Sequence, residues 1–205
     1  LWASLDAPID SAPLCRRVTP GSTVALVVSD MSRFWMRQDL VVPHLVDYLT
    51  QRCGVRERDI TIVIANGTHT GGDEAELRTL VTDAVYDRIT VENHDCESED
   101  LVYLGTTPHG TPVSINRTAA LADMVICLGA ATHHVMAGFG GGRKSILPGI
   151  SGRETIFHNH AFSLDATSLR SNPAVGNGIL QGNPLHEDMC EAAGLVKNLF
   201  MVNLV

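Results

Sequence analysis

The stretch VALVVSDMSR, residues 24–33, determines the class of fold: an unbroken apolar run passes directly into serine and charged groups. A strand that is apolar at every position is buried on both faces, as in a parallel sheet covered by helices. Two more runs have the same form, ITIVIA at 60–65 and MVICL at 124–128. The three runs therefore predict neighbouring parallel strands, each followed by polar residues.

Amphipathic segments separate these strands. Helical spacing or helix-flanking residues mark four of them: 43–54, 73–85 (capped by Asp73 or Thr70), 153–161 and 185–196. Residues 89–91 are typical of a further strand, and 106–113 of a loop or hairpin. This alternation predicts an α/β domain, Rossmann-like, with a mainly parallel sheet and flanking helices.

Composition limits the classes of partner. The chain has 205 residues with 15 basic and 23 acidic side chains, a net charge of −8. That surplus argues against nucleic acid or an anionic membrane as the main partner. No apolar run approaches the roughly 20 residues of a membrane span. The five cysteines are scattered without a Cys-x-x-Cys pair, so neither a disulfide framework nor a zinc knuckle is indicated.

The two ends of the sequence suggest a piece of a longer protein. The N-terminus has no basic stretch followed by an apolar core, so we expect a cytoplasmic protein without a signal peptide. The chain does not begin with methionine, and it stops inside the apolar run LFMVNLV. We expect residues 1–205 to form the incomplete N-terminal domain of a two-domain protein.

Polar clusters follow three of the predicted strands. Ligands of open parallel sheets bind beyond the carboxyl ends of the strands, so residues 30–33, 66–69 and 132–145 should meet there. His94, after another strand, is a weaker candidate. Ordinary explanations exist, since Asp30 could be a cap or pair with Arg33, and His69 could belong to a turn. Of the adjacent pair 133–134, and of the pair 158 and 160, only one histidine each should face the site.

The segment GFGGGRKS, residues 138–145, favours an anion-binding role. Small residues let backbone N–H groups approach an anion, and Arg143 and Lys144 add positive charge, which suits a phosphate. A P-loop is not indicated, because Arg143 stands where that motif needs glycine. Pro148 would also interrupt the helix that follows a P-loop.

Several spaced motifs together resemble one family. They are SDMSR (29–33), ANGTH (65–69), HHVMAGFGGGRKSILPGISGRETIFHNH (133–160) and GNPLHEDMCEAAGLV (182–196). The chain resembles the N-terminal catalytic domain of the lactate racemase family that uses a nickel-pincer nucleotide. This resemblance implies an isomerase, a racemase or epimerase of a small 2-hydroxy acid, that moves the α-hydrogen as hydride. It also implies, as partners, the proteins that make the cofactor.

Site residues carried over from the resemblance take these roles. Lys144 would join the cofactor, Ni(II)-pyridinium-3,5-bisthiocarboxylic acid mononucleotide, through a thioamide, and His160 would complete the nickel coordination. His69 and His134 would be the catalytic acid/bases. The segment expected along the cofactor's phosphate and the nearby site comprises Asp30, Met31, Ser32 and Arg33.

Two other functions remain open from the residues alone. The chain could be a non-catalytic nucleotide- or phosphate-binding module in which Lys144 is only a point charge. A zinc-dependent hydrolase is less consistent with the sequence, because no histidine pair has an acidic partner at helical spacing.

Departures from the family pattern occur beside the site, at Phe34, at Gly140 and at residues 132–133. The implied substrate is therefore the 2-hydroxy-acid class, with lactate as its default member.

Overall fold

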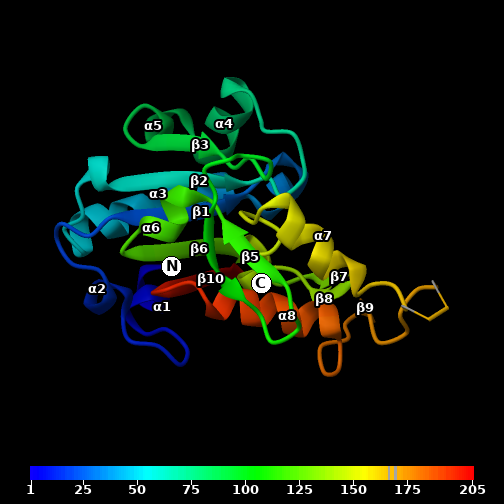
Figure 1. The fold of residues 1–205 in the computed structure, drawn as a ribbon. Helices are drawn as coiled ribbons and strands as arrows, with labels where there is room; N and C mark the ends of the chain where they lie inside the picture. The colour runs from blue at the N-terminus through cyan, green and yellow to red at the C-terminus, as the bar shows by residue number, and fades with distance from the viewer. Residues whose placement is uncertain (166, 169) are drawn as a thin grey trace.

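A central parallel sheet organises the chain. The computed structural model describes residues 1–165, 167–168 and 170–205. Its five strands lie in the order β10-β6-β1-β2-β3 (Figure 1). Their bounds are β1 Val24–Ser29, β2 Ile60–Ala65, β3 Thr90–Asn93, β6 Met124–Ala130 and β10 Leu199–Leu204. Val24 pairs in register with Ile60 on one side and Met124 on the other, and every pairing in this sheet is parallel. The predicted α/β class is confirmed.

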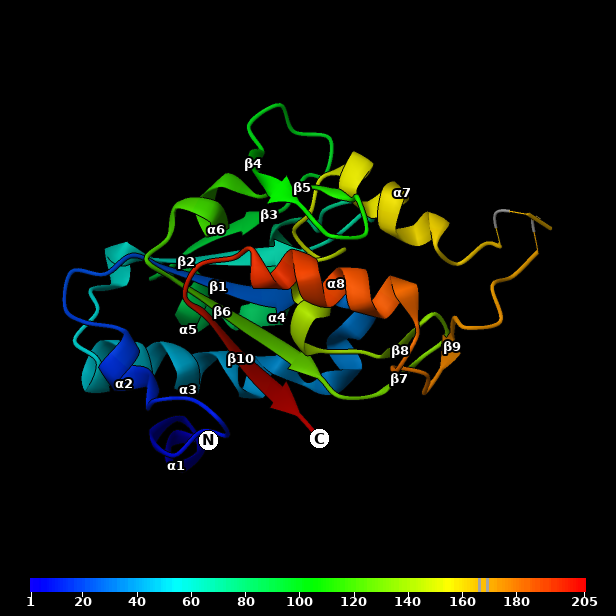
Figure 2. The ribbon, with the colours of Figure 1, turned by 60° about the horizontal axis from the view of Figure 1, so that its bottom comes forward.

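Helices cover both faces of the sheet (Figure 2). One side carries α1 Trp2–Asp6, α2 Leu14–Arg17, α3 Val42–Asp47, α4 Glu74–Val81 and α5 Asp83–Tyr86. The other side carries α6 Arg117–Leu121, α7 Arg153–Ala161 and α8 Pro184–Gly194. Along β1, Val24, Leu26 and Val28 enter the first core, whereas Ala25 and Val27 enter the second. This two-sided burial is the reason that the strand is apolar at every position.

Two predicted helices differ from the expected form. The helix from residue 43 continues past α3 as a π-helical turn, Tyr48–Arg52, and the chain leaves it at Gly54 with φ +73°. The segment 73–85 is broken at Thr82, whose φ of 75° separates α4 from α5. Asp73 is the N-cap of α4, since its side chain accepts a hydrogen bond from the Glu76 N–H at 2.9 Å.

Short elements complete the fold. β4 Val102–Thr106 and β5 Pro112–Ile115 form an antiparallel hairpin across the segment expected to be a loop or hairpin. A small sheet joins β7 His133–His134, β8 Ala137–Phe139 and β9 Gly176–Asn177. Short 3-10 helices lie at Met31–Met36 (η1), Gln38–Leu40, Glu57–Asp59 and Gly142–Ser145 (η5).

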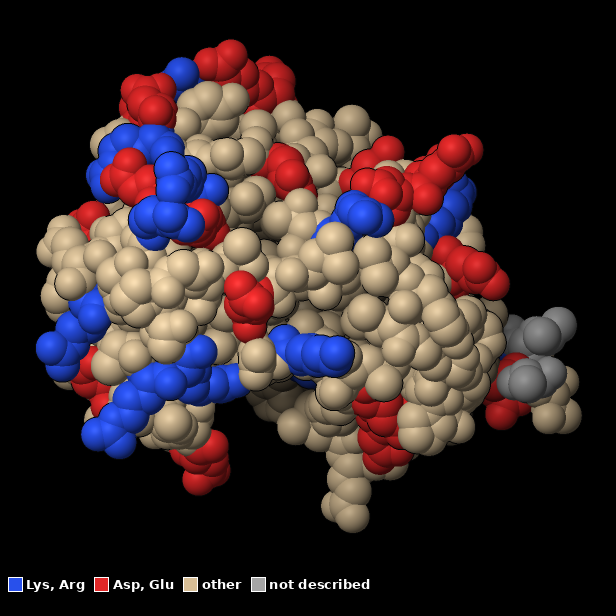
Figure 3. All heavy atoms as spheres, turned by 60° about the vertical axis from the view of Figure 1, so that its left-hand side comes forward, with Lys and Arg blue, Asp and Glu red and all other residues tan. Residues whose placement is uncertain are grey.

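The surface mixes charges of both signs. Figure 3 shows Lys and Arg side chains beside Asp and Glu over one face, rather than a single broad patch of either sign. Among the described residues, no helix combines the length and the apolar character that crossing a membrane requires.

Candidate functional site

A cavity of about 500 Å³ lies at the carboxyl ends of β1, β2 and β6. The segments that follow these three strands line it together with η5 and α7. Because β1 pairs in parallel with both β2 and β6, the three strands end at the same edge of the sheet. The predicted meeting of the three polar clusters therefore takes place in this structure.

Asp30 and His69 are joined across the ends of β1 and β2. Oδ2 of Asp30 lies 2.5 Å from Nδ1 of His69, and Oδ1 accepts a hydrogen bond from Ser32 Oγ at 2.6 Å. Arg33 Nη1 donates to Ser32 Oγ at 3.0 Å. A carboxylate can only accept, so the proton shared with Asp30 belongs to Nδ1 of His69. The other ring nitrogen, Nε2, is then left as the one that can exchange a proton with a ligand.

His134 and Lys144 form a second pair on the β6 side. Nε2 of His134 lies 3.2 Å from Nζ of Lys144. Burial lowers the pKa of Lys144 to about 8, helped by the charges of Arg33 and Arg143. Burial also lowers the pKa of His134 to about 4, and the neighbouring cations, Lys144 first, add to the shift. The neighbour, His133, lines the cavity too, but its ring stacks on Phe139.

The glycine-rich segment places Lys144 through backbone contacts. Gly141 has φ +71°, and a Cβ there would lie 2.6 Å from Oδ1 of Asn203 on β10. The next N–H, that of Gly142, donates to the same Oδ1 at 2.9 Å. Only glycine permits this approach and this backbone conformation. The segment is consequently held against β10 at the N-terminal end of η5.

Arg143 differs from its expected role as an anion-binding cation. Its Nη1 donates to the Phe139 carbonyl at 3.0 Å and its Nη2 to the Ala137 carbonyl at 2.6 Å. Burial lowers the pKa of the guanidinium. Two of its donors therefore tie the glycine-rich segment to β8, and the basic side chains that line the cavity are Arg33 and Lys144, not Arg143.

His160 reaches the cavity from α7. Its Nδ1 is 2.9 Å from the Ile156 carbonyl, one helical turn earlier, so Nδ1 carries the proton and Nε2 keeps a lone pair. Burial lowers the pKa of His160, which favours the neutral ring that a metal ion needs. His158 points elsewhere and contacts Thr111 Oγ1 at 3.0 Å. The expected division between these two histidines is found.

Two candidates do not line the cavity. Met31 packs against the first hydrophobic core instead. His94 is buried, with its Nε2 2.9 Å from the Ser151 carbonyl, so we assign it a structural role.

Side chains that sequence reasoning missed include Phe157, 54% exposed at the cavity rim. Phe157 precedes His160 by three residues, so helical spacing would have placed it on the same face.

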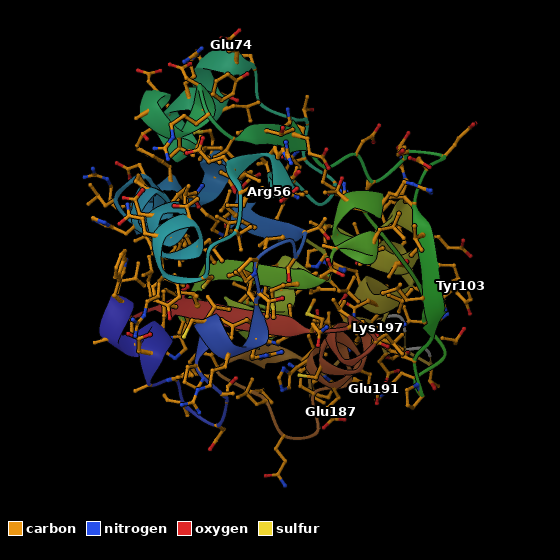
Figure 4. The ribbon with its side chains drawn as sticks, turned by 90° about the vertical axis from the view of Figure 1, so that its left-hand side faces the viewer. Arg56, Glu74, Tyr103, Glu187, Glu191 and Lys197 are labelled. Carbon is orange, nitrogen blue, oxygen red and sulfur yellow. The ribbon has the colours of Figure 1, made fainter. Side chains whose placement is uncertain are left out.

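A second group of metal-binding side chains lies outside the cavity. His109, Asp188 and Glu191 come close together, and Figure 4 labels Glu191 and Glu187 on α8. His109 Nδ1 is 2.8 Å from Glu191 Oε2. Asp188, however, is fully buried and already accepts from Thr107, Thr111 and Asn159. Those hydrogen bonds account for the buried Asp188 carboxylate, which is the centre of a structural hydrogen-bond network.

Comparison with known proteins points to one family. A family model for the lactate racemase N-terminal domain matches residues 1–171. The chain is 30% identical to the lactate racemase of Thermoanaerobacterium thermosaccharolyticum and 32% identical to that of Lactiplantibacillus plantarum, each over 203 residues. Each alignment covers 98% of the chain and 46% of the relative. The chain thus spans about half the length of the curated relatives it matches.

Solved structures give the same picture of the fold. The lactate racemase apoprotein from Thermoanaerobacterium thermosaccharolyticum superposes with a TM-score of 0.85 at 28% identity, covering 98% of this chain and 49% of that one. A structural-genomics protein from Thermotoga maritima superposes with a TM-score of 0.71 at 21% identity, covering 93% and 48%. The second likeness concerns the fold alone.

Proposed function

The chain belongs to the family of lactate racemase N-terminal domains, and on that premise we propose that it is the cofactor-binding part of a 2-hydroxy-acid racemase. One observation carries the proposal: His69, His134, Lys144 and His160, from four different segments, line a single cavity. The cofactor proposed is the nickel-pincer nucleotide, attached at Lys144 and held at the metal by His160. The substrate proposed is a small, lactate-like 2-hydroxy acid.

The residues present fit this cofactor. Imidazole nitrogen is a ligand that Ni(II) binds well, so a nickel-pincer cofactor would need one neutral imidazole from the protein. His160 is such an imidazole, because its Nδ1 is bonded to the Ile156 carbonyl and no hydrogen bond from the described residues reaches its Nε2. Lys144 has a pKa lowered to about 8, which suits an amine that would attack a carbon centre to form a thioamide. Gly140 and Gly141 line the cavity beside it without side chains.

The chemistry that the bound cofactor supplies is acceptance and return of the substrate's C2 hydrogen as hydride. The chain's own part is proton transfer at the substrate hydroxyl. His69, with Nδ1 held by Asp30, takes or returns that proton through Nε2. His134 does the same from the far side of β1, since β1 lies between β2 and β6. Two proton carriers on different sides can serve the two faces of a planar 2-keto acid.

The remaining polar groups suit an anionic ligand. Arg33 lines the cavity and bonds to Ser32, which in turn bonds to Asp30. A guanidinium there can bind the carboxylate of a 2-hydroxy acid or the cofactor's phosphate. Trp35, 58% exposed, lines the cavity at its rim, as do Thr132 and Gly140, where the chain departs from the family pattern. These positions are the ones to vary when the acid's side chain is sought.

The decisive experiment uses the full-length protein, co-expressed with the proteins that make the cofactor. We expect peptide mass spectrometry to find an adduct on Lys144 and elemental analysis to find nickel. Lys144→Ala should lose both. His69→Ala and His134→Ala should each keep the adduct but stop the interconversion of lactate enantiomers or of another chiral 2-hydroxy acid.

The matched control is His44→Ala, which removes a histidine from α3, outside the cavity. It should leave both adduct and racemisation unchanged. Binding of a nucleotide without an adduct, and equal in Lys144→Ala, would favour the non-catalytic module instead. Full racemisation by His69→Ala or His134→Ala would remove that histidine from the mechanism.

A further inference from the structure

In the contact between His134 and Lys144, the hydrogen-bond donor and the acceptor can be assigned. Nδ1 of His134 accepts hydrogen bonds from two backbone N–H groups, that of Met136 at 3.2 Å and that of Ala137 at 3.1 Å. An atom that accepts two N–H groups carries its lone pair, not a proton. The neutral imidazole must therefore carry its proton on Nε2, the atom that lies 3.2 Å from Nζ of Lys144.

This tautomer decides which form of lysine fits. A lysine ammonium has three donors and no acceptor, so it cannot bond to an imidazole nitrogen that already carries a proton. A neutral amine has a lone pair and can accept that N–H. The observed contact is a hydrogen bond only when Nε2–H of His134 donates to the amine of Lys144.

The surrounding charges act in the same sense. Burial of the pair acts first, followed by the charges of Arg33 on η1 and Arg143 on η5. The other titratable groups that line the same cavity are Asp30, His69, His133 and His160. In the described part of the chain, no carboxylate contributes to the shift of the Lys144 pKa. Burial and the two arginines thus disfavour a positive charge on Nζ.

We propose that His134 is a positioning residue for Lys144 that holds it as a neutral, nucleophilic amine before any group is attached to it. This inference deepens the proposed function. It rests on that function only in one respect, namely which group becomes attached to Lys144. On acylation by an activated ester such as the probe below, Nζ bonds to the carbonyl carbon and the C–O bond to the ester's leaving group breaks. That group departs with the electron pair, and the proton lost from nitrogen passes to solvent. The amide formed carries no charge, so it also removes one cause of the low His134 pKa.

The test uses full-length protein made without the cofactor-making proteins. The probe is the N-hydroxysuccinimide ester of acetate, and peptide mass spectrometry follows acetylation of Lys144 against pH. Lys197, the other lysine of this sequence, is exposed near the end of α8 and serves as the internal reference (Figure 4). We expect the Lys144 midpoint near pH 8, well below the ordinary lysine value of ~10.4.

The variant that isolates His134 is His134→Gln, because an amide can turn its oxygen toward an ammonium and stabilise it. Its Lys144 midpoint should rise by about one pH unit or more, a tenfold change in the amine fraction. His133→Gln, the matched control beside it, should keep the wild-type midpoint. An unchanged midpoint in His134→Gln, or a wild-type Lys144 midpoint at the ordinary lysine value of ~10.4, would overturn the proposal.

A second measurement does not depend on a variant folding. The ¹⁵N chemical shifts of the His134 ring in the wild-type protein should show Nε2 protonated and Nδ1 unprotonated at pH 8. The opposite tautomer would equally overturn the proposal. Neither readout needs the cofactor, so absence of an adduct in co-expressed protein would count against the proposed function and leave this result standing.

Discussion

The carboxylate of Asp30 and the imidazole of His69 meet across 2.5 Å, although they follow different strands. Asp30 was expected along the cofactor's phosphate and the nearby site, and that expectation stays a prediction. The contact adds a second role, because an Asp bonded to Nδ1 sets the tautomer of the ring and stabilises its protonated form. This pairing makes Asp30 the residue whose replacement is most informative.

Asp30→Asn should lower the rate of racemisation roughly 10²–10⁴-fold, the usual contribution of a positioned acid/base, with the Lys144 adduct retained. The reason is that the amide can present its N–H to the ring and favour the wrong tautomer. Turnover and adduct mass should be measured on the same preparation. Ser32→Ala, which removes one neutral bond to Asp30, should cost about tenfold or less. An adduct lost in Asp30→Asn would show that the carboxylate mainly binds the cofactor.

Gly141→Ala should destabilise the fold by about 2–3 kcal/mol, because φ > 0 strain adds to a close approach to Asn203. Gly182→Ala is the matched control, since Gly182 has φ +72° but nothing within 4 Å of the added Cβ. The control variant should lose only the free energy of the strained backbone conformation, about 1–2 kcal/mol. Urea unfolding of both variants measures the difference, and equal losses would remove the steric argument.

Asp188→Ala should destabilise by about 3 kcal/mol or more, because three buried donors lose their acceptor. The donors are Thr107 and Thr111 around the β4–β5 connection and Asn159 on α7. Glu191→Ala, one turn along α8, removes a partly exposed partner of His109 and should cost under about 1 kcal/mol. Free energies of unfolding in urea check both values. A metal requirement for stability that Asp188→Ala abolishes would contradict the structural explanation of this cluster.

Stability should fall on acidification, and two histidines should affect that fall in opposite ways. Burial lowers the pKa of His94 in the folded chain, so the unfolded chain takes up its proton first, and stability is lost below the ordinary value of 6.5. The Glu191 carboxylate raises the pKa of His109, so its contribution is fully present below 6.5 and is lost as pH rises through the folded value.

The measurement is urea unfolding at about pH 5.5 and pH 7.5, values that bracket the ordinary histidine pKa. His94→Gln should lose less stability between the two than the wild type, and His109→Gln should lose more. The burial-lowered pKa values of His134, His160 and His186 act in the same sense as that of His94. Changes of the same sign in the two variants would contradict the assignment.

The local sequence pattern was enough to predict most of the helices and strands. β1, β2 and β6 are apolar at nearly every position because helices cover both faces, and that requirement is visible in the residues themselves. α7 begins and ends where expected, Arg153–Ala161. The break at Thr82 was not foreseen, because the apolar spacing of 77–85 continues across it and only tertiary packing decides that residue's φ of 75°.

The site was predictable in outline because parallel strands that are apolar throughout place their following loops at one edge, whatever the details of packing. The sequence by itself therefore determined which segments meet: those after β1, β2 and β6, the last of which carries Lys144. The expectation for His160 came from the family resemblance. Tertiary structure alone decided the partners within the cavity. It turned Arg143 toward the carbonyls of Ala137 and Phe139, packed Met31 into the core, and set Asp30 against His69 and His134 against Lys144. Side-chain hydrogen bonds depend on distances of a few tenths of an ångström between segments far apart in the chain, and no local pattern of residues encodes those distances.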